Sequence, residues 1–380
     1  MDPTVRLLRD LVAIDSVNPS LVPGAAGEAA VAKALVAELE AIGLAVEVQE
    51  AAPGRPNVVA TLEGQRPGRS LMYCGHIDTV GVTGMPRPFV PEEREGRLYG
   101  RGSQDMKSGV AAMIGAARVI AESGGLDAGR LVIACVVDEE HASIGADALV
   151  TRWRADAAVV TEPTDLAIAV AHKGFEWVEV ETDGKAAHGS RPRDGRDAIL
   201  RMGRVLAALE VLDRSLQGEV PHPLLGTGSL HASLIEGGRE LSSYPDRCLL
   251  QLERRTLPRE RPGAASREVA EILERLSADD GEFVARSREL FARAPYEIAA
   301  DHDVPKALEA AARRRQCATS ITGMSFWTDA AVLGEAGIPS VLFGPSGAGL
   351  HGLDEYVELD SVLLCRDVLA DYARAWCGGA

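Results

Sequence analysis

The sequence predicts an α/β domain into which a smaller α+β domain is inserted. Apolar strands alternate with amphipathic helices over the first 174 residues, as in a sheet that is covered by helices. Between residues 175 and 291 the order becomes strand–helix–strand–strand–helix–strand, and helix–strand order returns from about Val304. We therefore assign residues 1–174 and 292–380 to one discontinuous domain and residues 175–291 to the inserted domain.

The elements of the discontinuous domain follow from apolar periodicity and turn residues. Residues 5–14 and 27–42 have apolar side chains at helical spacing, with Asn18-Pro19 between them and Gly43 as a C-cap. A long loop is expected over residues 81–103, followed by a helix of small residues to about Ala121. The remaining strands are expected at 46–50, 58–62, 71–74, 131–137, 157–160 and 340–343, and helical segments at 146–153, 304–315, 330–337 and 362–376.

In the inserted domain, residues 175–182 alternate apolar and acidic side chains, which predicts a strand with one exposed face. Further strands are expected at 230–235, 248–253 and 283–288, and helices at 197–212 and 266–276. This pattern is typical of a small α+β sandwich whose sheet has one polar face.

Composition and charge exclude several classes of protein. The length of 380 residues exceeds most single hydrophobic cores, and the net charge of −16 argues against a nucleic-acid binder. No apolar run is long enough to span a membrane, and the N-terminus lacks the features of a signal peptide. The six cysteines are scattered and form no Cys-x-x-Cys motif, so we expect neither a disulfide framework nor a cysteine zinc site. A cytoplasmic location is therefore expected.

Three predicted strands run directly into acidic or histidine residues. His76 and Asp78 follow the strand at 71–74, Asp138-Glu139-Glu140 follows 131–137, and Glu162 follows 157–160. Ligands collect at the carboxyl ends of strands in open α/β sheets. His76 and Asp78 point to the same face of an extended backbone, and a metal-bound imidazole often donates its second N–H to a carboxylate. Taken alone, this pair also fits an ordinary surface turn.

Two further candidates, Asp105 and His351, complete a set of ligands for metal ions. Two adjacent ions need a bridging carboxylate, a terminal ligand on each ion and a spare base, and such ions lie roughly 3.5–4 Å apart. Histidine and carboxylate ligands suit zinc, with cobalt or manganese as alternatives. Each of these residues by itself could equally be a turn residue, a cap or a solvated corner.

Five motifs in this order resemble those of the M20 metallopeptidases, which include acetylornithine deacetylase, succinyl-diaminopimelate desuccinylase, aminoacylase-1 and the glutamate carboxypeptidases. The matching motifs are Gly75-His76-Ile77-Asp78-Thr79-Val80, Gly100-Arg101-Gly102-Ser103-Gln104-Asp105-Met106-Lys107, Asp138-Glu139-Glu140, Thr161-Glu162-Pro163 and His351-Gly352-Leu353-Asp354-Glu355. The resemblance covers essentially the whole chain. It implies a mixed-sheet, zinc-exopeptidase-like catalytic domain, with the inserted domain as a lid and dimerisation domain.

The resemblance also implies a role for each candidate ligand. Asp105 bridges two divalent ions, and it is followed by a cis peptide. One ion has His76 and Glu162 as further ligands, and the other has Glu140 and His351. Asp78 orients His76, and Glu139 acts as the general base that takes a proton from the metal-bridging water.

On the substrate side, the resemblance implies that His188 stabilises the oxyanion, often in the active site of a partner subunit, so that a homodimer is expected. Arg255 matches an arginine that binds the substrate carboxylate, whereas Arg254 is expected at the surface. Ser242 stands where relatives often have asparagine, so the substrate preference is not carried over. Gly344 lies in a Gly-rich loop that either contacts the substrate or forms a plain turn.

The expected function is a dinuclear-metal amidohydrolase that cleaves the amide of a small N-acyl amino acid, like acetylornithine deacetylase or succinyl-diaminopimelate desuccinylase. A metallo-dipeptidase or a glutamate-carboxypeptidase-like exopeptidase acting on short peptides is the alternative. A non-catalytic binding protein with the same fold would predict the loss of a ligand or of the base, and the sequence retains all of them. A two-metal esterase is disfavoured, since the order and spacing of the motifs are those of amide hydrolases.

Overall fold

A computed structural model describes residues 1–379, and the chain divides into two compact units. The first unit comprises Met1–Val170, Ile298–Thr322 and the chain from Thr328 onward. The second comprises Ala171–Glu297 together with Gly323–Trp327. Its bounds therefore differ from the expected 175–291. Within this unit, Trp327 of the short second segment donates a hydrogen bond from Nε1 to the carbonyl of Ala294 at 3.0 Å.

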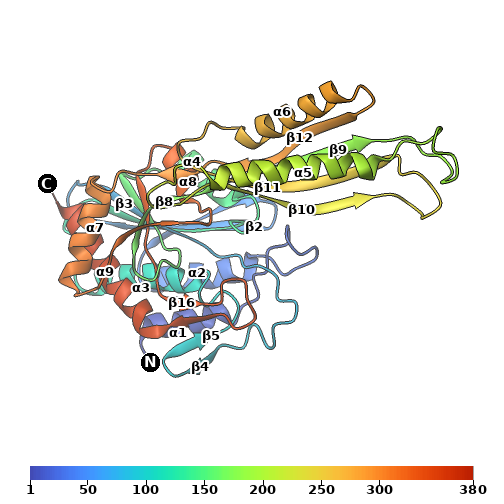
Figure 1. The fold of residues 1–380 in the computed structure, drawn as a ribbon. Coiled ribbons are helices and arrows are strands. Elements are labelled where there is room, and N and C mark those ends of the chain that lie inside the picture. The colour runs from blue at the N-terminus through green and yellow to red at the C-terminus, as the bar shows by residue number, and fades with distance from the viewer. Residues whose placement is uncertain (380) are drawn as a thin grey trace. The chain divides into compact units, whose positions relative to one another are not determined.

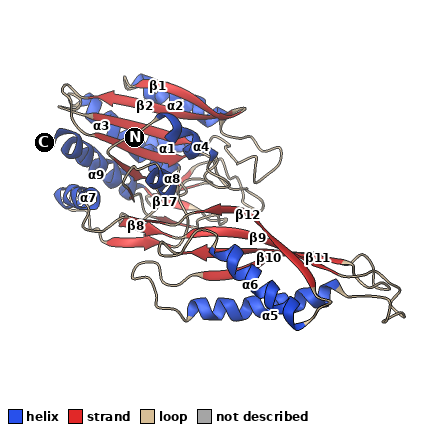
Figure 2. Ribbon diagram, turned by 90° about the horizontal axis from the view of Figure 1, so that it is seen from above, coloured by secondary structure: helices blue, strands red, loops and turns tan. Residues whose placement is uncertain are grey.

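A mixed sheet forms the centre of the first unit (Figure 1; Figure 2). Its neighbouring strands β6, β3, β7 and β15 are parallel, whereas β2 and β8 run antiparallel to their neighbours. The parallel strands are buried along nearly their whole length, as expected for strands with helices on both faces. Across the whole sheet, parallel and antiparallel strands together, the order is β1 (Ala45–Ala52), β2 (Arg55–Glu63), β6 (Arg130–Val136), β3 (Ser70–His76), β7 (Ala157–Val160), β15 (Ser340–Leu342) and β8 (Ile168–His172).

Helices cover both faces of this sheet, with α3 and α9 below it and α4 and α8 above it in Figure 1. α1 begins at Pro3, and the Asp2 carboxylate caps it by accepting the N–H of Thr4 at 2.7 Å. α3 lies close to the sheet because its residues are small: a Cβ on Gly109 would lie 1.9 Å from the Thr161 carbonyl oxygen. The helices of this unit are α1 (Pro3–Val12), α2 (Ala29–Ala41), α3 (Lys107–Glu122), α4 (Ile144–Arg152), α7 (Asp303–Arg314), α8 (Ala330–Glu335) and α9 (Leu359–Gly378).

The expected loop over residues 81–103 contains a short hairpin. β4 (Glu92–Arg94) pairs with β5 (Arg97–Tyr99), and β5 also pairs with the distant β17 (Tyr356–Glu358), next to β16 (Gly347–Ala348). These strands are only two or three residues long, so they have no detectable alternation of apolar residues. Their pairing joins the segment that carries Asp105 to the segment that carries His351.

The second unit contains a four-stranded antiparallel sheet with two helices on one face (Figure 1). The predicted order strand–helix–strand–strand–helix–strand is confirmed, and the core between the layers includes Val178, Met202 and Leu250. Across the sheet the strands are β10 (Ser229–Gly237), β11 (Arg247–Thr256), β9 (Gly174–Asp183) and β12 (Val284–Arg293), with α5 (Ala198–Gln217) and α6 (Ala264–Asp279) packed on them. Two further short strands, β13 (Tyr296–Glu297) and β14 (Ile321–Met324), pair with β8.

The other face of this sheet is charged, and its charges are paired across strands. Glu179 on β9 accepts a hydrogen bond from Arg288 on β12 at 2.7 Å, which explains the apolar and acidic alternation of β9. The expectation that Arg254 lies at the surface is wrong, since only 1% of its area is exposed. Its side chain lies on the helix-covered face, where it pairs with Glu260 at 2.7 Å and Glu268 at 3.1 Å.

The helices and cysteines add two observations. Within residues 1–379, no helix combines the length and the apolar character that a membrane span requires. All six cysteines are buried and have free thiols.

Candidate metal centre

The candidate metal centre lies at the carboxyl ends of three parallel strands. His76 is the last residue of β3 and pairs with Val136, the last residue of β6. β7, which is parallel to β3, ends at Val160. The segments that leave β6 and β7 carry Glu139-Glu140 and Glu162, so the parallel register brings these side chains to one edge of the sheet.

The two carboxylate oxygens of Asp105 face different histidines. Oδ1 lies 3.1 Å from Nε2 of His76, and Oδ2 lies 3.4 Å from Nε2 of His351. The same nitrogen of His351 lies 3.1 Å from Oε2 of Glu140. Asp105 thus stands between two imidazoles, which is the arrangement required of a carboxylate that bridges two metal ions.

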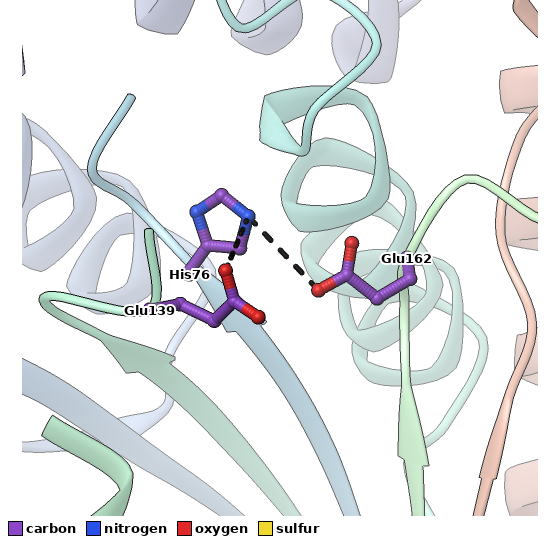
Figure 3. A group of neighbouring side chains, drawn as sticks. All are labelled: His76, Glu139 and Glu162. Carbon is purple, nitrogen blue, oxygen red and sulfur yellow. Dashed lines mark ion pairs between the residues drawn. The ribbon is translucent and has the colours of Figure 1, made fainter. Parts of the chain in front are cut away.

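Glu139 and Glu162 lie beside the His76 ring at nearly equal distances (Figure 3). Their nearest carboxylate oxygens are 3.9 Å and 4.0 Å from Nε2 of His76. The possible ligand atoms of His76, Glu139 and Glu162 all lie within 4.8 Å of one another, as do those of His76, Asp105 and Glu140. Their distances to His76 are therefore equally compatible with a metal ligand and with a general base.

The cluster concentrates negative charge in a buried place. In the metal-free protein, burial raises the pKa of Glu139 and that of Glu162 well above the usual range, because water cannot solvate their charged forms. Burial also acts to raise the pKa of Asp105, but hydrogen bonds from His351 and His76 outweigh it and lower that pKa. Four carboxylates are thus gathered around two imidazoles, since Glu140 belongs to the same cluster.

One atom of this cluster lacks a protein partner. Oε1 of Glu140 is buried and has no hydrogen bond from any of the residues 1–379 that the structure describes. A buried, unpartnered carboxylate oxygen is unfavourable, and burial also raises the pKa of Glu140. A divalent cation would supply the missing partner and would favour the charged forms of the surrounding carboxylates, so the residues present fit a metal pair.

The carboxylate of Asp78 was expected to orient His76, but its shortest contacts are with other groups. Nδ1 of His76 lies 3.0 Å from the main-chain oxygen of Asp78 but 3.6 Å from its carboxylate oxygen Oδ1. The carboxylate instead accepts the backbone N–H groups of Glu139 and Glu140, each at 3.2 Å. Asp78 therefore contacts His76 through its backbone and holds the acidic segment through its side chain.

Sequence reasoning gave no role to Glu355, which supports the Asp105 loop. Its carboxylate accepts the backbone N–H of Gln104 at 2.9 Å and of Asp105 at 3.1 Å, and it pairs with Arg101 at 2.6 Å. The only sequence signal was its place at the end of the His351 motif. The peptide between Asp105 and Met106 is cis, as the resemblance predicted.

The predicted substrate residues of the second unit lie at opposite ends of its sheet. His188 is exposed, with Nδ1 2.8 Å from the Ser190 hydroxyl, and the carbonyl of Ser242 accepts the N–H of Gly189 at 2.7 Å. Arg255 pairs with Phe175 at the start of β9, whereas His188 follows the end of β9 at Asp183. At about 3.3 Å per residue, residues 175 to 183 span about 26 Å.

Gly344 is buried beside the metal centre, and its backbone groups are already paired. Its N–H donates to the Thr164 hydroxyl at 3.0 Å, and its carbonyl accepts the N–H of Leu166 at 3.0 Å. A Cβ at this position would lie 2.2 Å from the carbonyl oxygen of Glu162. The amide of Gly344 therefore does not provide the anion cradle considered for this loop, and the glycine instead permits close packing against Glu162.

Comparison with known proteins places these features in a family. Residues 72–375 match peptidase family M20/M25/M40. The chain is 32% identical over 357 residues to an acetylornithine deacetylase from Myxococcus xanthus, and the alignment covers 90% of this chain and 91% of the relative. A tripeptidase from Staphylococcus aureus has a TM-score of 0.81 and 21% identity, with 99% of this chain and 98% of the other covered.

A dinuclear metal binding peptidase of the M20 family from Bacillus subtilis has a TM-score of 0.75 and 17% identity, covering 99% of this chain and 98% of the other. At such identities, the two solved structures establish a common fold. They confirm the expected mixed-sheet domain with an inserted antiparallel sheet.

Proposed function

Because the chain belongs to peptidase family M20/M25/M40, we propose that it is a dinuclear-metal amidohydrolase that removes the acyl group from an N-acyl amino acid. The observation that carries the proposal is the position of Asp105, whose two carboxylate oxygens face His76 and His351 separately. The relative from Myxococcus xanthus supports deacylation, since it is called an acetylornithine deacetylase and aligns over 90% of this chain.

In this proposal the metal ligands form two sets that share Asp105. His76 and Glu162 would hold one divalent ion, and Glu140 and His351 would hold the other. Zinc suits these nitrogen and oxygen ligands, and cobalt or manganese are expected substitutes. When bound, such ions polarise the amide carbonyl and lower the pKa of the attacking water.

Glu139 serves as the general base and later as the general acid. Its carboxylate is 3.9 Å from Nε2 of His76, and its backbone N–H is held by Asp78. It accepts a proton from the attacking water and donates it to the nitrogen of the leaving amine as the amide bond breaks. The adjacent Glu140 pairs with His351, so the two neighbouring glutamates have separate roles.

Arg255 and His188 act on the substrate in different ways. Arg255 has an exposed side-chain fraction of 31% and is proposed to bind the substrate carboxylate, with Glu253 at 2.7 Å holding its Nε. His188 is proposed to stabilise the oxyanion of the tetrahedral intermediate. Arg255 pairs with Phe175 at one end of β9, and His188 follows the other end at Asp183; because this length of strand spans about 26 Å, we infer that one copy cannot apply both residues to a small substrate. Ser242, on the loop that contacts Gly189, shares the end of the unit that carries His188.

This separation supports a homodimer in which the partner subunit supplies its histidine. Apolar side chains on the second unit offer a surface for that contact, because β10 is an edge strand of the four-stranded sheet. The exposed fractions are 66% for Leu234, 57% for Ile235 and 73% for Leu200 on α5. Isologous contact of two such edges would bury these side chains.

A metallo-dipeptidase or a glutamate-carboxypeptidase-like exopeptidase remains the second candidate. The fold similarity to a tripeptidase favours it, and the same metal centre would serve a peptide amide equally well. A non-catalytic binding protein is the remote alternative, and it is disfavoured because no proposed ligand or base is missing.

Turnover of a defined substrate panel tests the proposal. The protein, loaded with zinc, cobalt or manganese, is given N-acetyl and N-succinyl amino acids, dipeptides and tripeptides, and the release of free amine is measured. We expect N-acyl amino acids to be cleaved, activity to be lost with a chelator, and two ions to be bound per chain. Cleavage of peptides alone would support the exopeptidase, whereas a protein with two bound ions and no hydrolysis of any amide would contradict both enzymes.

A further inference from the structure

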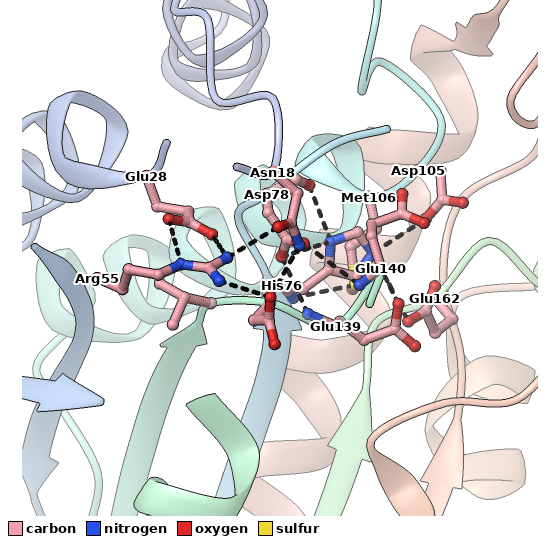
Figure 4. Close-up of polar contacts among 12 residues, drawn as sticks. Asn18, Glu28, Arg55, His76, Asp78, Asp105, Met106, Glu139, Glu140 and Glu162 are labelled. Atoms are coloured by element: carbon pink, nitrogen blue, oxygen red, sulfur yellow. Dashed lines mark hydrogen bonds and ion pairs between the residues drawn. The ribbon is translucent and has the colours of Figure 1, made fainter. Parts of the chain in front are cut away.

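Next to the metal centre lies a group of buried polar side chains to which the proposed reaction assigns no role. It consists of Glu28, Arg55, Asn18 and Asp138, which we call the Arg55 network, and each of them is at most 9% exposed. Figure 4 shows Glu28 and Arg55 on one side of Asn18 and Asp78, with His76 and the acidic metal-site residues on the other side. The network belongs to the first unit throughout.

Arg55 is the hub of the network. Its Nε donates to Oε2 of Glu28 at 3.0 Å, and a second guanidinium nitrogen also pairs with Glu28. On the side facing the metal centre, Nη1 donates to Oδ1 of Asp138 at 2.6 Å, and Nη2 donates to Oδ1 of Asn18 at 3.2 Å. The planar guanidinium is suited to this task, because it presents several donors at fixed angles.

Asn18 joins this hub to the metal centre. Its Nδ2 donates to Oδ2 of Asp78 at 2.8 Å and to Oδ1 of Asp138 at 3.1 Å. Asp78 in turn accepts the backbone N–H groups of Glu139 and Glu140, and its own main-chain oxygen contacts His76. A continuous path of hydrogen bonds thus leads from Arg55 to the proposed base and to two proposed ligands.

Asp138 sets the direction in which the acidic segment leaves β6. Its backbone has a φ of 69°, a left-handed conformation that is uncommon for a residue other than glycine. Its carboxylate accepts the N–H of Ala142 at 3.2 Å, and its carbonyl accepts the same N–H at 3.1 Å. Arg55 holds this carboxylate from the other side, so that contacts fix both ends of the turn from Asp138 to Ala142, which contains Glu139 and Glu140.

We propose that Arg55 and Asn18 are positioning residues of the metal centre, which act by fixing Asp78 and the turn at Asp138. This inference rests on the proposed dinuclear metal site. If the network only stabilised the fold, the pair of Arg55 with Glu28 would suffice, and no connection through Asn18 to Asp78 would be needed. The connection gives the metal ligands an outer set of partners, whose loss typically lowers metal affinity by about 10- to 100-fold.

The test compares two substitutions in the network with one outside it. Asn18→Ala removes the amide that joins Asp78 to Asp138 without leaving a new buried charge, and Arg55→Lys keeps the charge but loses the planar donors. Arg118→Met is the matched control: Arg118 pairs with Glu38 at 2.6 Å in the same unit, both side chains are less than a fifth exposed, and neither contacts the metal centre. For each protein we would measure zinc affinity by chelator competition, kcat, KM and the thermal unfolding midpoint of the metal-free form.

For Asn18→Ala we expect zinc affinity and kcat to fall by about 10- to 100-fold, with KM changed by no more than about twofold. Arg55→Lys should show a smaller fall in the same direction, and Arg118→Met should keep the affinity and kcat of the parent even if its unfolding midpoint falls. Parent-like zinc affinity in Asn18→Ala, or equal losses in Asn18→Ala and Arg118→Met, would overturn the inference. Zinc affinity is read without turnover, so a protein that binds two ions but cleaves no acyl amino acid would refute the proposed function alone.

Discussion

Glu139 and Glu162 carry the same functional group and lie at almost the same distance from His76, yet they are proposed to do different chemistry. The contacts that hold their backbones differ. The backbone N–H of Glu139 donates to the Asp78 carboxylate, and the neighbouring residue is Glu140, which pairs with His351. Glu162 instead follows β7, and Gly344 packs against its carbonyl. At the scale of single residues, the roles of these two glutamates are therefore the point to test.

Replacing each of the two carboxylates by its amide separates a base from a ligand. Glu139→Gln should keep both metal ions and lower kcat by about 10²- to 10⁴-fold, because an amide cannot accept the proton. Glu162→Gln should lose one ion, since a neutral amide is a poorer ligand than a carboxylate. Metal content per chain and turnover of the same preparations provide the measurement. The reverse pattern would mean that the two glutamates exchange roles.

His172 is a single residue whose charge state affects the stability of the second unit. It is fully buried beside Tyr296 and Trp327, and burial lowers its pKa to about 4. The unfolded chain binds a proton at about pH 6.5, so the contribution of the neutral imidazole is present above that pH and is lost as the pH falls towards 4. The loss between pH 7 and pH 5 should be about 2 kcal/mol.

The variant His172→Phe tests this pH dependence. Phenylalanine keeps the ring among its aromatic neighbours and removes the titrating group, and Nε2 of His172 has no hydrogen-bond partner among residues 1–379. Urea unfolding at pH 7 and at pH 5 should show a smaller loss of stability for the variant than for the parent. Equal losses in the two proteins would show that another group is responsible.

At the scale of elements, β11 shows how a strand in the second unit places alternate residues on two faces of the sheet. Successive residues of β11 alternate, so that Arg254 is buried under α6 while Arg255 lies on the open face with Glu253.

β10 lies at the edge of the sheet, and a register shift between Ala232 and Leu234 interrupts its pairing with β11. Bulges of this kind are common at sheet edges, where they change which side chains are exposed.

The edge at β10 is the proposed dimer contact, and a charge placed there should weaken it. Leu234→Asp should raise the dimer dissociation constant by about 30-fold or more, since a central interface residue contributes about 2 kcal/mol or more. Val48→Asp is the control, because Val48 is 52% exposed on β1, an edge strand of the mixed sheet in the first unit. Sedimentation velocity over a range of concentrations measures both. Dimers of unchanged strength in Leu234→Asp would exclude this edge as the contact.

At the scale of the whole molecule, the proposed reaction needs residues from two units and from two copies of the chain. The proposed metal ligands all belong to the first unit, whereas the proposed substrate residues His188, Ser242 and Arg255 belong to the second. Arg255 pairs with Phe175 at one end of β9, and His188 lies beyond the other end. The strand between these ends spans about 26 Å, which exceeds the length of a small acylated amino acid. A complete active site would therefore be a property of the dimer.

Mixing two inactive variants tests this shared site. A chain with Glu139→Gln keeps His188, and a chain with His188→Ala keeps Glu139, so a hybrid dimer has one complete site if the histidine acts across the interface. Random exchange makes half of the dimers hybrid, and total activity should recover to about a quarter of the parent value. Activity after co-refolding or co-expression is the measurement. No recovery in proven hybrid dimers would show that His188 does not act across subunits.

The sequence by itself determined the family, the fold class and the set of residues that gather at the metal centre. Parallel strands that lie in register end at one edge of a sheet, so His76, Glu139, Glu140 and Glu162, which follow apolar strands, meet there. Asp105 and His351 come from turn segments, and only their motifs placed them in the same set. The inserted domain repeats the order strand–helix–strand twice. This order could also be predicted from the sequence, because apolar periodicity is a local property of the chain.

Only the tertiary structure decided which of these side chains contact each other and what supports them. Asn18 meets Asp78 from 60 residues away, and Glu355 meets the amides of the Asp105 loop from about 250 residues away. Such bonds require donor and acceptor atoms to lie within about 3 Å, and no local pattern encodes that distance. The burial of Arg254, the hairpin at β4 and β5, and the packing of Gly344 against Glu162 were undetermined for the same physical reason.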